Sequence, residues 1–133
     1  MADQSVAQLL LESAGHDLRA SQALAAIADI HDTIVGFHAQ QAVEKSLKAV
    51  LSHAGVAFRR THDIAELLDV MADARLAPAP HSDRLDELQP YAVDARYGLV
   101  EPGRLDRTRI LAMVAAVLDW ASSLLAAPMR ARR

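Results

Sequence analysis

The stretch that decides the fold is Phe37-His38-Ala39-Gln40-Gln41-Ala42-Val43-Glu44-Lys45-Ser46-Leu47-Lys48-Ala49. It lies within a run from about Thr33 to His53 whose apolar residues recur every three to four positions, and Gly55 follows as a stop signal. On the resulting helix, polar side chains gather on one side: Gln41, Lys45 and Lys48 form a continuous face, with Gln40 and Glu44 beside it. That face either holds an anion or is a solvated surface in which Glu44 pairs with Lys48.

Helical patterns also cover most of the remaining sequence. They predict a first long helix from about Ser5 to Asp29, a short helix opened by Asp63, a second short helix capped by Ser82 or Asp83, and a final long helix from about Leu105 to Leu125. Aromatic residues make up only 4% of the chain, which favours close-packed helices over a sheet. We therefore expect an all-α, up-and-down antiparallel bundle of four to five helices: two long N-terminal helices, two short ones and one long C-terminal helix.

Length and composition restrict the class of protein. A chain of 133 residues fits one domain, residues 1–133. Cysteine is absent, which excludes disulfides and thiolate metal sites. The first residues lack the features of a signal peptide, and no apolar segment approaches the roughly 20 residues that span a bilayer. We therefore expect a cytoplasmic protein with no membrane association. The net charge of -3 argues against a general nucleic-acid coat but leaves room for a local basic site.

The six histidines do not predict a metal site. No two of them are spaced four residues apart on a predicted helix, and no carboxylate–histidine set has the spacing of metal ligands. We therefore expect neither a bound metal nor a cofactor.

Two other segments contain side chains suited to binding. In Arg60-Thr61-His62-Asp63, the imidazole of His62 can donate to a phosphate or perform acid–base chemistry, whereas the alternative is that the segment only organises a helix N-terminus. In Tyr91-Ala92-Val93-Asp94-Ala95-Arg96-Tyr97, Arg96 offers a planar fork for phosphate and Tyr97 a ring for stacking. Asp94 supports that group, or else forms an ion pair with Arg96 that pins the loop.

The central helix and these two segments, in this order, resemble the HEPN family over nearly the whole sequence. The resemblance implies a helical bundle that is often dimeric. Many such proteins are encoded beside a minimal nucleotidyltransferase, sometimes as the toxin half of a toxin–antitoxin pair, and others are metal-independent ribonucleases or nucleotide binders. Ribonuclease members carry an arginine with a histidine shortly after it, near the start of the last helix. After Arg96 the corresponding positions hold Glu101, Pro102 and Gly103, so that motif is incomplete.

Three functional hypotheses follow. The first is a HEPN-like protein that binds a nucleotide or RNA phosphate and acts with a nucleotidyltransferase partner, as a homodimer and as one half of a toxin–antitoxin pair. Its predicted ligand-binding residues are Gln41, Lys45, Lys48, His62, Asp94, Arg96 and Tyr97. The second is a degenerate metal-independent ribonuclease toxin whose catalytic residues are Arg96 and His62. The third is a non-catalytic structural dimerisation module.

Overall fold

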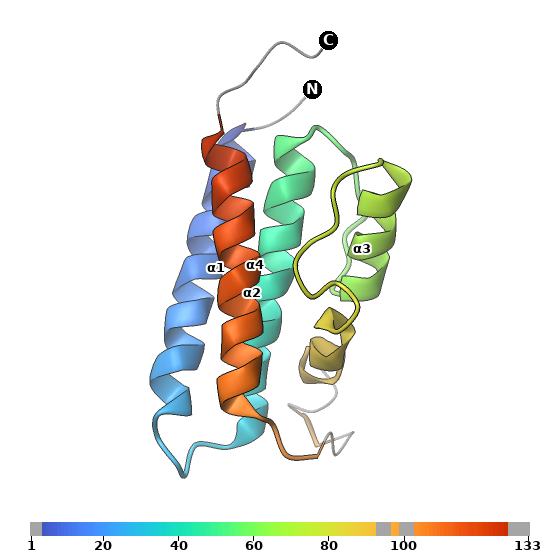
Figure 1. The fold of residues 1–133 in the computed structure, drawn as a ribbon. Helices are drawn as coiled ribbons and strands as arrows, with labels where there is room; N and C mark the ends of the chain where they lie inside the picture. Colours follow the sequence, from blue (N-terminus) through green and yellow to red (C-terminus); the bar gives the residue numbers. More distant parts are fainter. Residues whose placement is uncertain (1–3, 93–96, 99–102, 128–133) are drawn as a thin grey trace.

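The computed structural model describes residues 4–92, 97–98 and 103–127. Their helices are α1 (Gln4–Ala25), α2 (Asp32–His53), α3 (Ile64–Asp73), the 3₁₀ helix η1 (Leu85–Tyr91) and α4 (Arg107–Ala126). The three long helices lie side by side, with α1 running opposite to α2 and α4, while α3 and η1 flank α2 (Figure 1). The predicted all-helical bundle is therefore confirmed. Asp94 and Arg96 lie outside the described residues.

Helix α2 forms the centre of the core. Five of its regularly spaced apolar residues are buried: Val35, Ala39, Val43, Leu47 and Val50. Helix α1 packs against it through three small buried residues at seven-residue intervals: Ala7, Ala14 and Ser21. Small side chains at this spacing let two helices approach closely along their length. The Ser21 hydroxyl also donates to the carbonyl of Val35 at 2.9 Å, so this buried hydroxyl is satisfied.

The first helix ends at Ala25, four residues before the predicted end at Asp29. Residues beyond it form tighter turns, in which the amide of Ile27 bonds to the carbonyl of Leu24 at 3.1 Å. The cause lies on α4, since the guanidinium of Arg107 donates to the carbonyls of Ala25, Ile27 and Ile30. These contacts satisfy carbonyls that would otherwise lack partners at the end of a helix.

Side-chain caps open α3 and α4. Asp63 accepts from the amide of Glu66 at 3.3 Å, as its spacing predicts, and Asp106 accepts from the amide of Arg109 at 3.1 Å. The predicted cap at Ser82 or Asp83 is wrong, because η1 follows Arg84 with no side-chain cap. Pro90 lies inside η1 and has no amide proton for an α-helical bond. The short 3₁₀ form suits this sequence better than an α-helix.

The prediction that no segment could span a bilayer is wrong for α4 by length and composition. This helix has 20 residues and a mean hydropathy of 1.6 over its most apolar 18. It nevertheless packs into the bundle through Ile110, Met113, Val114, Val117 and Ala121. Core helices of soluble proteins pass the same test, so one such helix is weak evidence for a membrane span. A cytoplasmic location stays a prediction.

Candidate functional site

The candidate site is built around the buried carboxylate of Glu44, on the middle of α2. Glu44 is only 3% exposed. Its carboxylate accepts from Nε2 of Gln40 at 3.0 Å and from Nζ of Lys48 at 2.9 Å, and Nδ1 of His62 lies 3.0 Å from it. Gln41 extends the network by donating to Oε1 of Gln40 at 2.8 Å. We call these five residues the Glu44 cluster.

The Glu44 cluster is not the solvated surface that the sequence offers as one alternative for this helix. The expected pair between Glu44 and Lys48 is present, but it is not a solvated pair, because the Lys48 side chain is only 13% exposed and Gln40 is fully buried. A buried carboxylate is stable only when donors surround it. The polar residues of α2 therefore form an internal hydrogen-bond network that reaches the surface at its edge.

Lys45 does not join Lys48. Its ammonium group turns to α1, where it lies 2.6 Å from Oδ2 of Asp17 and 2.9 Å from the hydroxyl of Ser13. The other oxygen of Asp17 lies 3.0 Å from Nδ1 of His38. The two lysines are thus held by different carboxylates, and the structure does not show a phosphate site shared between them.

The backbone of His62 is fixed from two sides. Its carbonyl accepts from Nε2 of Gln40 at 3.3 Å and from Nε2 of Gln89, on η1, at 3.0 Å. The same Gln89 amide accepts from the backbone N–H of Ile64 at 2.9 Å. Just before α3, the hydroxyl of Thr61 accepts from the amide of Asp63 at 3.0 Å. Side chains from α2 and η1 therefore fix the backbone of His62 just before α3 begins.

The His62 ring is 64% exposed although its Nδ1 contacts a buried carboxylate. When the neutral ring donates from Nδ1 to Glu44, its second nitrogen, Nε2, carries a lone pair. When the ring is protonated, Nε2 is a donor instead. The arrangement thus presents an oriented imidazole that can contact an anion or accept a proton at Nε2.

Of the other candidate residues, Asp63 and Tyr97 lie in the described part of the chain. Tyr97 is 68% exposed, whereas Asp94, Arg96 and the proposed pair between them fall on residues outside those described. Asp63 has the capping role that the sequence offered as an alternative. Sequence reasoning did not identify Glu44, Gln40 and Gln89 as the residues that hold His62. Only the proximity of Gln40 and Glu44 on one helix hinted at this arrangement.

Two nearby arginines differ in how free they are to bind a ligand. Arg59 makes a two-point contact with Glu66, from Nε at 2.6 Å and from Nη2 at 2.7 Å. These hydrogen bonds, and then the charge of Glu66, raise the pKa of Arg59. Arg60, next in the chain, is exposed. Within the described ranges, no group of three histidines and carboxylates could hold a metal ion.

Comparison with known proteins places the chain in a family. The sequence model of the HEPN domain matches residues 7–124. No curated protein and no solved structure matches the chain. A HEPN domain indicates a function related to nucleotides or RNA. Because the match covers most of the sequence from α1 to α4, the chain belongs to the HEPN domain family.

Proposed function

We propose that this HEPN protein binds the phosphate of a nucleotide or of RNA at the exposed edge of the Glu44 cluster. The observation that carries the proposal is the state of His62: its ring is 64% exposed, while its Nδ1 contacts a carboxylate that is 3% exposed. An exposed side chain that is already held in one orientation loses less entropy on binding than a free one. Its Nε2 is the group that contacts the phosphate.

The ion pairs of the two lysines favour His62 as the residue that contacts the phosphate. The charge of Lys48 is offset by Glu44, and that of Lys45 by Asp17. Positive charge near the exposed edge therefore comes from Arg60, and also from His62 when its ring carries a proton on both nitrogens. Lys48 and Gln41 act behind this edge: Lys48 pairs with Glu44, and Gln41 orients Gln40. Lys45 supports the packing of α1 on α2.

Arg96, Tyr97 and Asp94 stay predicted contributors to the same site. Arginine offers two parallel donors to phosphate, and an exposed tyrosine ring offers a surface on which a base can stack. Asp94 is predicted to orient Arg96. These roles rest on the sequence alone for Asp94 and Arg96.

Binding by wild type and His62→Gln tests the proposal, with a fluorescently labelled short RNA and with ATP as competitor. Loss of one hydrogen bond to a charged group weakens binding about tenfold or more. His16→Gln is the matched control, because His16 is exposed on α1 and its ring makes a hydrogen bond with Arg19, outside the Glu44 cluster. Equal affinities of wild type and His62→Gln would overturn the proposal. Loss of affinity in His16→Gln as well would point to a non-specific effect of charge.

A metal-independent ribonuclease is the second candidate function, and the pairing of His62 with Glu44 favours it. A neutral imidazole held at Nδ1 can accept the proton of a ribose 2′-hydroxyl at Nε2. The 2′-oxygen then forms a bond to phosphorus, the bond from phosphorus to the 5′-oxygen breaks, and the leaving oxygen takes up a proton. Arg96 is the predicted stabiliser of the phosphate charge.

This second function predicts products that end in a 2′,3′-cyclic phosphate, formed in the presence of EDTA. Electrophoresis of RNA incubated with the purified protein would show them, and His62→Gln would abolish them. RNA that stays intact after long incubation would remove this candidate. If RNA and nucleotides also fail to bind, a structural dimerisation module remains as the third hypothesis.

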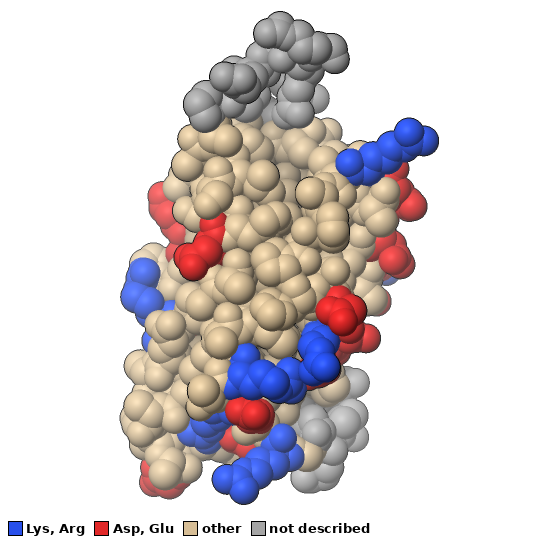
Figure 2. Space-filling view, viewed as in Figure 1, with Lys and Arg blue, Asp and Glu red and all other residues tan. Residues whose placement is uncertain are grey.

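We further propose that the protein forms a homodimer and acts with a nucleotidyltransferase partner, as one half of a toxin–antitoxin pair. Support for a second copy comes from the wide, largely uncharged surface over α4 (Figure 2). Within the most apolar 18-residue stretch of α4, 28% is buried inside one chain. Sedimentation analysis tests the dimer. Co-purification with a nucleotidyltransferase encoded beside this protein, and relief of growth arrest by it, test the partnership.

A further inference from the structure

A second site lies away from the Glu44 cluster, between α3 and the chain that follows it. Residues 76–86 turn back over one face of α3 (Figure 1), and an open pocket of about 660 Å³ lies between them and the helix. This volume is typical of pockets that hold small organic molecules, about 300–1,000 Å³. Most of the lining is apolar, from Ala65, Leu68, Met71, Ala72, Leu76, Pro78 and Ala79.

The charged groups that line this pocket all have the same sign. They are the carboxylates of Asp69, Asp83 and Asp86, and none of them makes a hydrogen bond or an ion pair with another described residue. The pocket therefore keeps a negative charge that no side chain lining it offsets.

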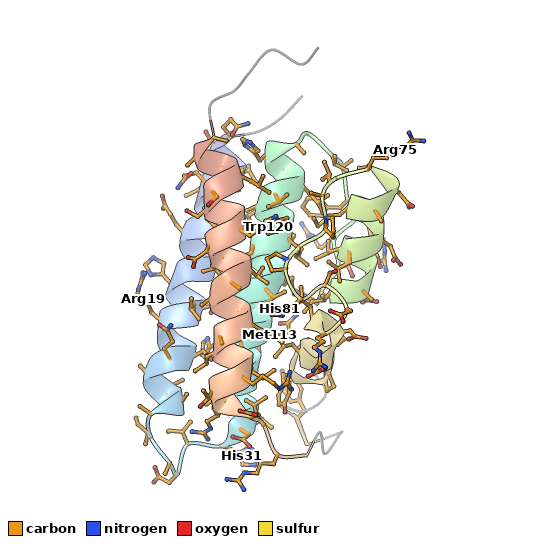
Figure 3. The ribbon with its side chains drawn as sticks, in the orientation of Figure 1. Arg19, His31, Arg75, His81, Met113 and Trp120 are labelled. Carbon is orange, nitrogen blue, oxygen red and sulfur yellow. The ribbon has the colours of Figure 1, made fainter. Side chains whose placement is uncertain are left out.

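Cationic side chains near the pocket are directed elsewhere. Arg84, in the sequence between two of these aspartates, contacts Glu87 at 4.0 Å and does not line the pocket. Arg75 extends away from the end of α3, and His81 lies toward α4 (Figure 3). Neither contributes to the lining. An incoming cation would thus meet three carboxylates that have no competing partner.

The arrangement also indicates the size of the cation. Within the described residues, no three carboxylates and histidines come close enough together to hold a metal ion. The three aspartates therefore line the pocket without forming the close group that a metal ion needs. A small inorganic ion would leave the apolar lining exposed to water, whereas a molecule with an apolar body and a charged end would cover it.

We propose that this pocket binds an organic amine, an alkyl- or arylammonium ion whose apolar body lies against Leu68, Met71 and Leu76. The ammonium group is attracted by the negative charge of Asp69, Asp83 and Asp86. This site is independent of the phosphate site proposed above, since the two have opposite charge and share no residue.

Titration of the full chain with 4-phenylbutylamine tests this site, by calorimetry and by backbone amide NMR. Two further compounds separate the contributions: 4-phenylbutyrate has the same apolar body with the opposite charge, and spermidine has positive charge without an apolar body. We expect 4-phenylbutylamine to bind most tightly. Its shift changes should lie in 65–72, 76–79 and 82–86. Both comparison compounds should bind at least about fivefold more weakly.

Two variants decide whether the aspartates carry the selectivity. Asp83→Asn/Asp86→Asn should weaken binding of 4-phenylbutylamine by about two- to fivefold for each charge removed. Asp73→Asn/Asp119→Asn is the matched control, because it removes the same charge from aspartates that do not line the pocket. Circular dichroism melting of each variant shows that it is folded. Wild-type affinity in the pocket variant would overturn the proposal, as would equal binding of 4-phenylbutyrate or shift changes elsewhere in the chain.

Discussion

Replacement of Glu44 by alanine should destabilise the fold strongly, because Glu44 is the acceptor at the centre of a buried hydrogen-bond network. The substitution leaves the ammonium group of Lys48, whose side chain is 13% exposed, without its partner 2.9 Å away. It also removes an acceptor from Gln40, which is fully buried and keeps only the His62 carbonyl, at 3.3 Å. Removing one partner of a buried ion pair costs about 3–5 kcal/mol.

The partial exposure of Lys48 places our expectation at the lower end, about 3 kcal/mol of the free energy of unfolding. For a domain of this size, that corresponds to a fall in melting temperature of roughly 10 °C. Urea denaturation at pH 7, followed by circular dichroism, measures the free energy directly. Glu66→Ala is the control: its hydrogen bonds to Arg59 are shorter, at 2.6 and 2.7 Å, but the Arg59 side chain is 74% exposed, so we expect little change.

A double-mutant cycle separates the ion pair from other effects of the substitution. Lys48→Met in the Glu44→Ala background removes the unpaired charge and should restore part of the lost stability. We expect a coupling free energy of about 1–3 kcal/mol between the two positions. A loss below about 1 kcal/mol in Glu44→Ala, or additive effects of the two substitutions, would refute the reasoning, since Glu44 would then not be the acceptor that holds the network together.

Three further predictions concern the end of the bundle where η1 meets α2. A Cβ atom at Gly36 would lie 2.3 Å from Cδ1 of Tyr91, so Gly36→Ala should cost about 1–3 kcal/mol in urea denaturation, and much less in a Tyr91→Ala background. Burial would raise the pKa of Asp32, but hydrogen bonds from the Leu105 amide and Arg107 lower it below 3.8 overall. The stability that Asp32 contributes is thus complete above pH 3.8 and is lost as the pH falls through the lowered pKa. Asp32→Asn should therefore flatten the pH dependence of the free energy of unfolding between about pH 2 and 4. An unchanged slope would contradict this. Burial, and then the charge of Asp32, raise the pKa of Tyr91 above 10.0, so its ionisation, followed by ultraviolet absorbance, should begin only at a pH above that of a free tyrosine and should destabilise the fold there.

Sequence periodicity was enough to predict the long helices and the core face of α2, because both depend on local spacing of apolar residues. The end of α1 was predicted four residues too late, since the guanidinium that satisfies its last carbonyls belongs to Arg107, about eighty residues further along the chain. The partner of Lys45 was missed for a similar reason, because Asp17 belongs to another helix. Local patterns report neighbours three and four residues apart, whereas these contacts depend on how whole helices pack.

The contacts within the candidate site likewise depend on how the helices pack, and not only on spacing along one helix. Lys45 and Lys48 share one helical face in the sequence, but the fold assigns each of them to a different carboxylate, so their main role is to hold helices and the Glu44 cluster together. His62 becomes part of the site only because residues 54–63 run back along α2 and bring it to Glu44 (Figure 1). Substitution of either lysine would therefore lower stability and binding together and could not separate the two. His62 lies at the exposed edge of the network, so its ring can be changed with the smallest effect on the core, and it is the position at which function can be tested apart from folding.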